Sequence, residues 1–305
     1  MDDAGHLPVM LSEVRELLSP ALSGGGGMPA PVLVDCTVGL GGHAEALLES
    51  AEAGTILIGI DLDESNLLRT KERLARFGPR VRLFSANFAD VDQVLAEAGL
   101  AQAGALLADL GVSSVHLDEP ERGFSFQVDG PLDMRLKPAG KTAADLVNWL
   151  AENELADVIY RYGEERFSRR IARAIVEARR RERIQRTGQL AEIVARSVPR
   201  SPGDRGRIHP ATRTFMALRI AVNRELDNLE QLLSKLPRLL GVGGRAAVIS
   251  FHSLEDRLVK QSLAALAEAG AHKPLTRKPL MAQADEMQRN PRSRSARLRA
   301  IERIR

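Results

Sequence analysis

Three apolar segments in the first third of the chain each end at an aspartate. They cover residues 32–35, 56–61 and 105–109, and the aspartates are Asp35, Asp61 and Asp109. Short apolar runs that contain β-branched residues and lack helical spacing are typical of strands buried on both faces of a parallel sheet. In an open α/β sheet the ligand lies outside the carboxyl ends of the strands. The three carboxylates therefore predict one crevice for a small molecule at that edge.

Strand and helix patterns alternate along the first 110 residues. Strands are predicted at 32–35, 55–61, 81–85 and 105–109, and helices near 42–52, 64–77 and 90–98. A glycine-rich loop at 24–27 precedes the first strand. This βαβ alternation predicts a parallel sheet with right-handed crossovers.

The alternation stops after Asp109 and resumes near the end of the chain. Thr142 and Asp145 form a capping box for a helix that extends to Ile159, and Ser168 and Thr187 are predicted to cap two more. A long helix is expected from Pro210 through residue 229. A buried strand at 246–249, a helix near 255–268 and two edge strands near 274–280 and 296–301 complete the sheet.

This order predicts an α/β protein in which a Rossmann-like core contains an inserted, mainly helical domain. We expect the core to comprise residues 1–110 and 212–305, and the insertion residues 111–211. Large aromatic residues are more often core than surface. Trp149, Tyr160 and Tyr162 are therefore expected in the core of the inserted domain.

Charge is strongly partitioned along the chain, although the net charge is only +3. Residues 1–160 carry a net charge of −14, residues 161–219 carry +10, and residues 273–305 carry +7. All sixteen basic residues of the middle segment are arginines. Guanidinium groups pair with phosphates in bidentate fashion, so the segment indicates a polyanionic partner. Solvated helix faces are the alternative interpretation.

Cysteine content and hydropathy exclude several protein classes. Cys36 is the only cysteine, so a disulfide framework and a cysteine-built zinc site are excluded. No histidine cluster has zinc-ligand spacing; the scattered carboxylates leave magnesium open, but we expect no metal. The sequence shows neither a leader peptide nor an apolar run of the ~20 residues that span a bilayer. We therefore expect a cytoplasmic protein that is not associated with a membrane.

The segment after the first predicted strand indicates a nucleoside cofactor. It contains Gly39, Gly41 and Gly42 followed by His43. Glycines let the backbone approach a ligand, and the next helix adds oriented N–H groups. Asp61 ends the second strand, where a carboxylate accepts ribose hydroxyls.

The glycine pattern is compatible with two cofactors. With Ala44 it satisfies the dinucleotide fingerprint, so a nicotinamide-dependent dehydrogenase is one alternative. That class needs a second mononucleotide-binding half, where this chain has an arginine-rich segment. An acidic residue, Asp35, precedes the glycines, which resembles the loop of S-adenosylmethionine-dependent methyltransferases. Phe88, after the third strand, is the candidate ring beside the adenine.

Motifs along nearly the whole chain resemble one family in particular. They are 6–14 (HLPVMLSEV), 35–43 (DCTVGLGGH), 108–114 (ADLGVSS), 117–126, 129–135 (DGPLDMR), 163–166 (GEER), 209–215 (HPATRTF), 250–257 (SFHSLEDR) and 290–296 (NPRSRSA). Together they resemble the bacterial methyltransferases that modify N4 of a decoding-centre cytosine, in the P-site region of 16S ribosomal RNA.

This resemblance implies a cofactor, a partner and a set of binding residues. The cofactor is S-adenosylmethionine, the partner is 16S rRNA in the small ribosomal subunit, and family members can form homodimers. The implied cofactor-binding residues are Gly41, Gly42, His43, Asp61, Phe88, Asp109 and His116. His116 stands where the family has a glutamine, and an imidazole still makes one hydrogen bond there.

The exocyclic N4 of cytosine is a poor nucleophile because its lone pair is delocalised into the ring. Transfer needs in-line placement of the reacting atoms and an acceptor that orients the amine. Asp109, Ser113 and His252 are the catalytic candidates, although a structural role for His252 is equally compatible with its position after the fifth strand. A non-catalytic ribosome-assembly factor with a vestigial pocket is the remaining alternative.

Aromatic and arginine side chains are the candidates for RNA contacts. Phe124 or Phe126 is predicted to stack on an extruded cytosine. The candidate phosphate contacts are Arg135, Arg166, Arg169, Arg170, Arg213, Arg292 and Arg294.

Overall fold

The computed structural model describes residues 8–23, 31–199 and 209–305 and divides into two compact units. The core unit comprises Met1–Gly111 and Leu226–Arg305, and the helical unit comprises Val112–Glu225. The predicted loop at 24–27 and His6 of the first motif lie outside the described residues.

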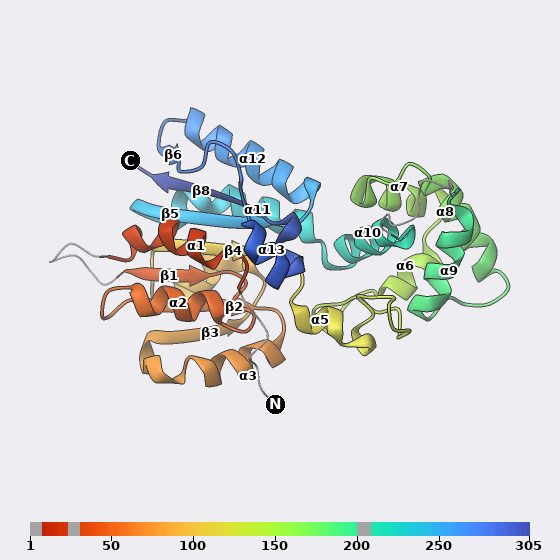
Figure 1. Cartoon of the computed structure of the whole chain (residues 1–305), viewed down its shortest axis with the longest axis horizontal. Helices are drawn as coiled ribbons and strands as arrows, with labels where there is room; N and C mark the ends of the chain where they lie inside the picture. The colour runs from red at the N-terminus through yellow and green to blue at the C-terminus, as the bar shows by residue number, and fades with distance from the viewer. Residues whose placement is uncertain (1–7, 24–30, 200–208) are drawn as a thin grey trace. The chain divides into compact units, whose positions relative to one another are not determined.

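The core unit contains one mixed sheet with the strand order β3-β2-β1-β4-β5-β8-β6, and β7 pairs with β8 (Figure 1). Its strands are β1 Val32–Asp35, β2 Ile56–Asp61, β3 Val81–Ser85, β4 Ala103–Asp109, β5 Leu240–Ser250, β6 His272–Pro274, β7 Leu280–Met281 and β8 Arg297–Arg303. The first five strands are parallel, and β8 is antiparallel to its neighbours. The strand order reverses between β1 and β4, the point at which doubly wound sheets bind ligands. The predicted α/β fold is confirmed.

Helices cover both faces of this sheet. They are α1 Leu11–Leu18, α2 Gly42–Ser50, α3 Glu64–Arg73, α4 Val91–Glu97, α11 Glu225–Leu239, α12 Ser253–Glu268 and α13 Ala284–Arg289. α4, α11 and α12 pack on one face, and α1, α2 and α3 pack on the other. Because all four residues of β1 are buried, its unbroken apolar sequence is explained by cover on both faces.

The carboxyl-terminal part of the sheet differs from the prediction. β5 begins at Leu240, six residues before the predicted strand at 246–249, and it includes Gly241, Gly243 and Gly244. The predicted edge strand near 296–301 is β8, which lies inside the sheet between β5 and β6. Apolar alternation marks a strand but does not give its neighbours, and this explains the difference.

The helical unit contains α5 Ser114–Asp118, α6 Ala143–Trp149, α7 Glu152–Gly163, α8 Ser168–Arg179, α9 Thr187–Ser197 and α10 Ala211–Asn223. α7 packs closely on α10: a Cβ at Gly163 would lie 2.7 Å from the carbonyl oxygen of Arg213. Since α10 packs on α6, α7 and α9, the unit extends to Glu225 and not to residue 211.

Local helix signals were partly right. The capping box of Thr142 and Asp145 is present, but the predicted single helix breaks at Leu150, whose backbone is extended, into α6 and α7. Phe167, not Ser168, is the N-cap of α8. Arg186, not Thr187, is the N-cap of α9, and the Thr187 hydroxyl accepts the Gly130 N–H at 3.0 Å.

Two more expectations about this unit were wrong. The long helix predicted from Pro210 is interrupted at Arg224, which has a left-handed conformation (φ 50°) between α10 and α11. Trp149 and Tyr160 are not core residues, since they are 63% and 61% exposed, and Tyr162 is half-buried. Within the described residues, no helix combines the length and the apolar character needed to cross a bilayer.

Candidate active site

The glycine loop and the end of β2 form one side of the crevice. Gly39 and Gly41 have positive φ values of 50° and 79°, which a side chain would disfavour. The Gly39 N–H donates to Asp61 Oδ2 at 3.0 Å, and the Thr70 hydroxyl donates to the Gly39 carbonyl at 2.5 Å. The loop predicted to cradle the cofactor therefore lies directly against the predicted ribose-binding carboxylate.

Asp61 is held in one orientation by backbone and side-chain donors. Its Oδ1 accepts the Asp63 N–H at 2.7 Å, and its Oδ2 also accepts from Asn66 Nδ2 at 3.3 Å. The residue is only half-buried, so its carboxylate remains reachable from solvent. An oriented acceptor of this kind fits the paired hydroxyls of a ribose.

Asp35 and Asp109 are joined through Thr37. The Thr37 N–H donates to Asp35 Oδ1 at 3.1 Å, and the Asp109 N–H donates to the Thr37 hydroxyl at 2.7 Å. The hydroxyl thus connects the carboxyl ends of β1 and β4 at the switch point. The sequence placed Thr37 in the loop motif but did not predict this contact, because no local pattern indicates a hydrogen bond between a loop threonine and another strand.

Burial raises the pKa of both carboxyl groups. Asp35 is 1% exposed, and burial, together with the nearby Asp61 charge, raises its pKa to about 7 in spite of the Thr37 hydrogen bond. Burial and the neighbouring Asp35 and Glu255 raise the pKa of Asp109 well above its usual range. Closely spaced buried carboxyls resist simultaneous ionisation. A cation bound in the crevice would relieve this repulsion.

His43 lies at the start of α2 and is buried. Its Nε2 is 2.9 Å from the Val9 carbonyl, so Nε2 is a donor, and its Nδ1 lies 3.8 Å from Asp109 Oδ2. A Cβ at Gly42 would lie 2.5 Å from Pro8 Cγ. The segment around Pro8 therefore packs on the glycine loop, and this gives a physical reason for the motif that begins at residue 6.

The crevice also retains an unsatisfied polar atom. Asp109 Oδ1 is buried and has no hydrogen-bond partner among the described residues. Such atoms are costly unless a ligand or water satisfies them. Phe88 lies shortly after the carboxyl end of β3 and is half-buried against the apolar core. A glycine cradle, an oriented carboxylate and an unsatisfied acceptor fit a nucleoside cofactor with a cationic centre.

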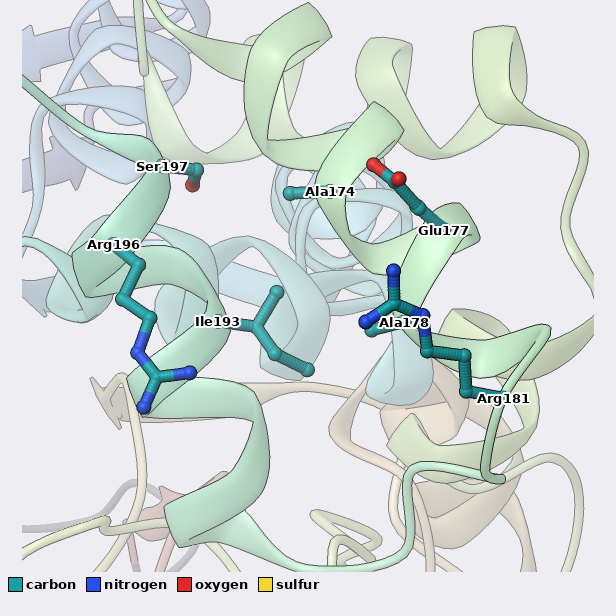
Figure 2. Close-up of a pocket in the computed structure, with 7 residues that line it drawn as sticks. All are labelled: Ala174, Glu177, Ala178, Arg181, Ile193, Arg196 and Ser197. Carbon is teal, nitrogen blue, oxygen red and sulfur yellow. The ribbon is translucent and has the colours of Figure 1, made fainter.

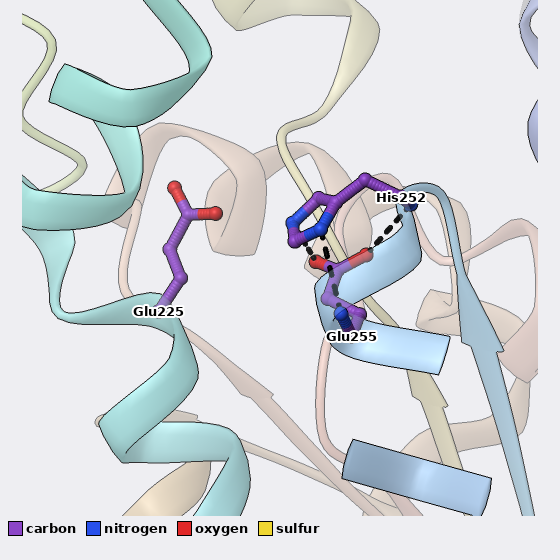
Figure 3. Close-up of side chains that lie close together, drawn as sticks. All are labelled: Glu225, His252 and Glu255. Atoms are coloured by element: carbon purple, nitrogen blue, oxygen red, sulfur yellow. Dashed lines mark hydrogen bonds and ion pairs between the residues drawn. The ribbon is translucent and has the colours of Figure 1, made fainter. Parts of the chain in front are cut away.

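His252 has a structural contact that sequence reasoning had allowed for. It is the N-cap of α12, where its Nδ1 accepts the Glu255 N–H at 3.4 Å. Its Nε2 lies 3.2 Å from Glu255 Oε1. Figure 3 shows the imidazole ring and the Glu255 carboxylate facing each other, joined by dashed lines. The Glu255 side chain in turn accepts the N–H groups of Phe251 and His252. Both ring nitrogens therefore face Glu255, and the capping role explains the residue; its catalytic role stays a prediction.

Ser113, His116, Phe124 and Phe126 are the predicted serine, histidine and aromatic residues of the helical unit. The Ser113 hydroxyl is buried and has no hydrogen-bond partner among the described residues, which is compatible with its predicted role. The Ser113 N–H donates to His116 Nδ1 at 3.3 Å, and the His116 ring stacks on Phe124 at 5.5 Å between ring centroids. Phe126 lies 4.7 Å from the Phe215 ring. Phe124 is only 7% exposed, so little of its ring is open to a base. Stacking of Phe124 or Phe126 on a cytosine stays a prediction.

The arginines predicted to bind phosphate differ in their surroundings. Arg135 forms a two-pronged ion pair with Asp133, at 2.8 Å for each contact, and this pair lowers the pKa of Asp133. Arg213 Nη1 lies 3.8 Å from Glu165 Oε2. The side chains of Arg166, Arg169, Arg170, Arg292 and Arg294 are all exposed. Their phosphate contacts stay a prediction.

The strand order and the residues gathered at the switch point fit a Rossmann-like class I methyltransferase, and the family match identifies S-adenosylmethionine as the cofactor of this class. A model of the MraW methylase family matches residues 3–304. The chain is 49% identical to the ribosomal RNA small subunit methyltransferase H of Syntrophobacter fumaroxidans, over 97% of this chain and 96% of that protein. It is also 49% identical to the protein of that name from Sorangium cellulosum, over 98% and 91% of the two chains. The chain belongs to the MraW methylase family, and the dehydrogenase alternative is excluded.

Proposed function

We propose that this methyltransferase transfers a methyl group from S-adenosylmethionine to N4 of a cytosine in the decoding centre of 16S rRNA. Family membership and the name shared by the relatives support methylation of small-subunit rRNA. The base, the atom and the decoding-centre position rest on the motif resemblance. The partner is the small ribosomal subunit in the cytoplasm, and formation of a homodimer stays a prediction that sedimentation would test.

The core unit provides the cofactor site. S-Adenosylmethionine supplies an electrophilic methyl group on a positively charged sulfur. Asp61 would accept the ribose hydroxyls, and the Gly39–Gly42 loop would let the backbone approach the amino-acid part of the cofactor. The buried carboxyls of Asp35 and Asp109 would favour the positive charge. Phe88 and His43 are proposed to contact the bound cofactor, and His116 to replace the usual glutamine.

Asp109 is the proposed residue for orienting the reaction. Its unsatisfied Oδ1 can accept a hydrogen from the cytosine amine or from the cofactor, and either contact would fix the geometry of attack. An acceptor of raised pKa is also a better base for the proton that the methylated amine loses. Ser113 and the backbone carbonyls after β4 are proposed to assist. The buried Oδ1 of Asp109, which lacks a hydrogen-bond partner among the described residues, is the single observation that supports this assignment.

The decisive experiment combines an assay in vitro with mapping in cells. Purified protein and labelled S-adenosylmethionine are incubated with small-subunit particles, and the rRNA is digested and analysed for N4-methylcytidine. We expect the modified nucleoside to appear in vitro and to be lost from cells that lack the protein. Restoration by wild type but not by Asp109→Asn would assign the activity to this site. A protein that binds the subunit without methylating it would be an assembly factor, and the proposal would then be wrong.

A further inference from the structure

The only tryptophan of the chain lies on the surface of the helical unit. Trp149 is the last residue of α6 and is 63% exposed, whereas a tryptophan is usually mostly buried. The guanidinium carbon of Arg183 lies over its ring, 5.5 Å from the centroid. Trp149 is not part of the hydrophobic core of the unit, and its exposed area is available to a flat ligand.

The segment beside Trp149 is fixed by contacts with the end of α6. The Asn148 side chain donates to the Ile184 carbonyl at 2.7 Å and accepts the Ile184 N–H at 3.1 Å. Arg179 donates to the Val147 carbonyl at 2.7 Å. The chain after α8 is therefore held in place before any partner arrives, and binding there would cost little conformational entropy.

This segment is also strongly basic. Residues 179–186 contain five arginines and one glutamate. Arg179, Arg183 and Arg186 contact the helical unit itself. Arg180 and Arg181 are exposed and form no ion pair with any residue that the structure describes. Arg180 and Arg181 precede by three and two residues the Arg183 that contacts the exposed indole, and such a combination of cations and one aromatic ring matches the phosphates and base of a nucleotide.

A hollow of about 310 Å³ between α8 and α9 adjoins this segment. Figure 2 shows Arg181 and Arg196 on opposite sides of Ile193, and two alanines contribute to the lining. Glu177 also lines it, and Arg196 pairs with Glu192, so the hollow itself is not uniformly positive. Arg181 lines this hollow and also belongs to the basic segment 179–186, so the hollow continues into that segment.

We propose that Trp149, Arg180, Arg181 and Arg183 form a binding surface for an unpaired nucleotide of the RNA substrate, here called the Trp149 surface. The base stacks on the exposed face of Trp149, and the adjoining phosphates pair with Arg180 and Arg181. RNA fits better than a protein partner because the group that contacts the exposed ring is a guanidinium, that of Arg183, and the segment around it is rich in arginine. Arg183 also pairs with Asp145 at 3.4 Å, which orients it over the ring. The inference rests on the proposed function and adds a contact outside the methyl-transfer site.

The single tryptophan makes the test direct. A short single-stranded oligoadenylate is titrated into the full-length protein while Trp149 fluorescence and the anisotropy of labelled RNA are recorded. We expect quenching that follows the binding curve. Trp149→Ala should weaken RNA binding about 5- to 100-fold, the range expected for loss of one stacked base, and Trp149→Phe should restore most of the affinity. Binding without quenching, or no binding by wild type, would overturn the proposal.

Arginine variants test the phosphate contacts. Arg180→Gln/Arg181→Gln should reduce the slope of log affinity against log salt by about 1.4, because each single-strand phosphate contact contributes about 0.7. Arg15→Gln/Arg69→Gln removes two exposed arginines of the core unit and the same total charge, so it is the matched control. An equal effect of both doubles would indicate long-range charge only and would contradict a local surface.

Methylation measured on the same variants separates this inference from the proposed function. Trp149→Ala should raise KM for the RNA substrate and leave kcat and KM for S-adenosylmethionine unchanged. One outcome would overturn only the Trp149 surface: wild type methylates rRNA, and Trp149→Ala keeps normal RNA affinity and a normal KM. In that case a protein of the subunit would be the partner that contacts Trp149. Fluorescence quenching without methylation by wild type would overturn only the proposed function.

Discussion

Replacement of Asp35 by asparagine should stabilise the core unit in a pH-dependent way. The folded pKa of Asp35 is about 7 and the ordinary value is 3.8. The unfolded chain therefore releases this proton near pH 4, whereas the folded protein keeps it until about pH 7. Wild type loses stability as pH rises through this window. About 3 pH units at 1.36 kcal/mol each set an upper limit of roughly 4 kcal/mol.

Asparagine removes the titration and keeps the local geometry. Its Oδ1 can still accept the Thr37 N–H, so Asp35→Asn and wild type should be of similar stability near pH 4. The variant should be more stable above pH 7, by an amount that approaches the limit of about 4 kcal/mol. Loss of the Asp35 charge also makes Asp109 easier to ionise in the folded protein, which adds to the stability of the variant at high pH.

Urea unfolding followed by far-UV circular dichroism at several pH values between 4 and 8 measures this effect. Circular dichroism is preferable to fluorescence because the only tryptophan lies in the helical unit. Asp157→Asn, at an exposed carboxylate of α7, is the control and should change stability by less than about 0.5 kcal/mol. Parallel stability curves for Asp35→Asn and wild type between pH 4 and 8 would refute the reasoning.

Three further predictions concern the crevice. Asp109→Asn should lower kcat by about 10²–10⁴-fold in a fixed-time methylation assay without lowering the melting temperature, and near-normal turnover would show that Asp109 is not the orienting group. Gly42→Ala should destabilise the protein by about 1–3 kcal/mol in thermal melts, because the new methyl group would lie 2.5 Å from Pro8 Cγ. Gly99→Ala is the control: its methyl group meets no atom within 4 Å, so it should destabilise the protein less in spite of the positive φ of Gly99. Affinity for S-adenosylmethionine should rise between pH 6 and 8, because ionised Asp35 favours the sulfonium charge, and affinity for the uncharged thioether product should rise less. Calorimetry that finds equal pH dependence for the two ligands would contradict a charge interaction.

The predictable parts of the site were those encoded in neighbouring residues. Asp35, Asp61 and Asp109 follow apolar runs, and parallel strands bring such ends to one edge, so the crevice could be predicted without coordinates. The sequence did not reveal that the Thr37 hydroxyl connects β1 with β4, because that hydrogen bond joins residues 72 positions apart. The pKa of Asp35 likewise depends on burial by distant segments.

Helix ends and aromatic exposure were less predictable for a similar reason. Serine and threonine are common N-cap residues, so Ser168 and Thr187 were predicted as N-caps. The N-caps of α8 and α9 are instead Phe167 and Arg186, because tertiary contacts decide where each helix begins. Trp149 was expected in the core on composition alone. Its exposure depends on how the end of α6 meets the segment around Ile184, which no local pattern encodes.

By itself, the sequence determined the alternation of strands and helices, the parallel half of the sheet and the acidic residues at the strand ends. Each of these depends on hydrophobic period and turn chemistry within a few residues. Only the tertiary structure decided that β8 lies between β5 and β6, that His252 caps α12, and that Asp35 retains a proton near pH 7. Those features arise from pairing and desolvation between segments far apart in the chain, and local sequence carries no record of them.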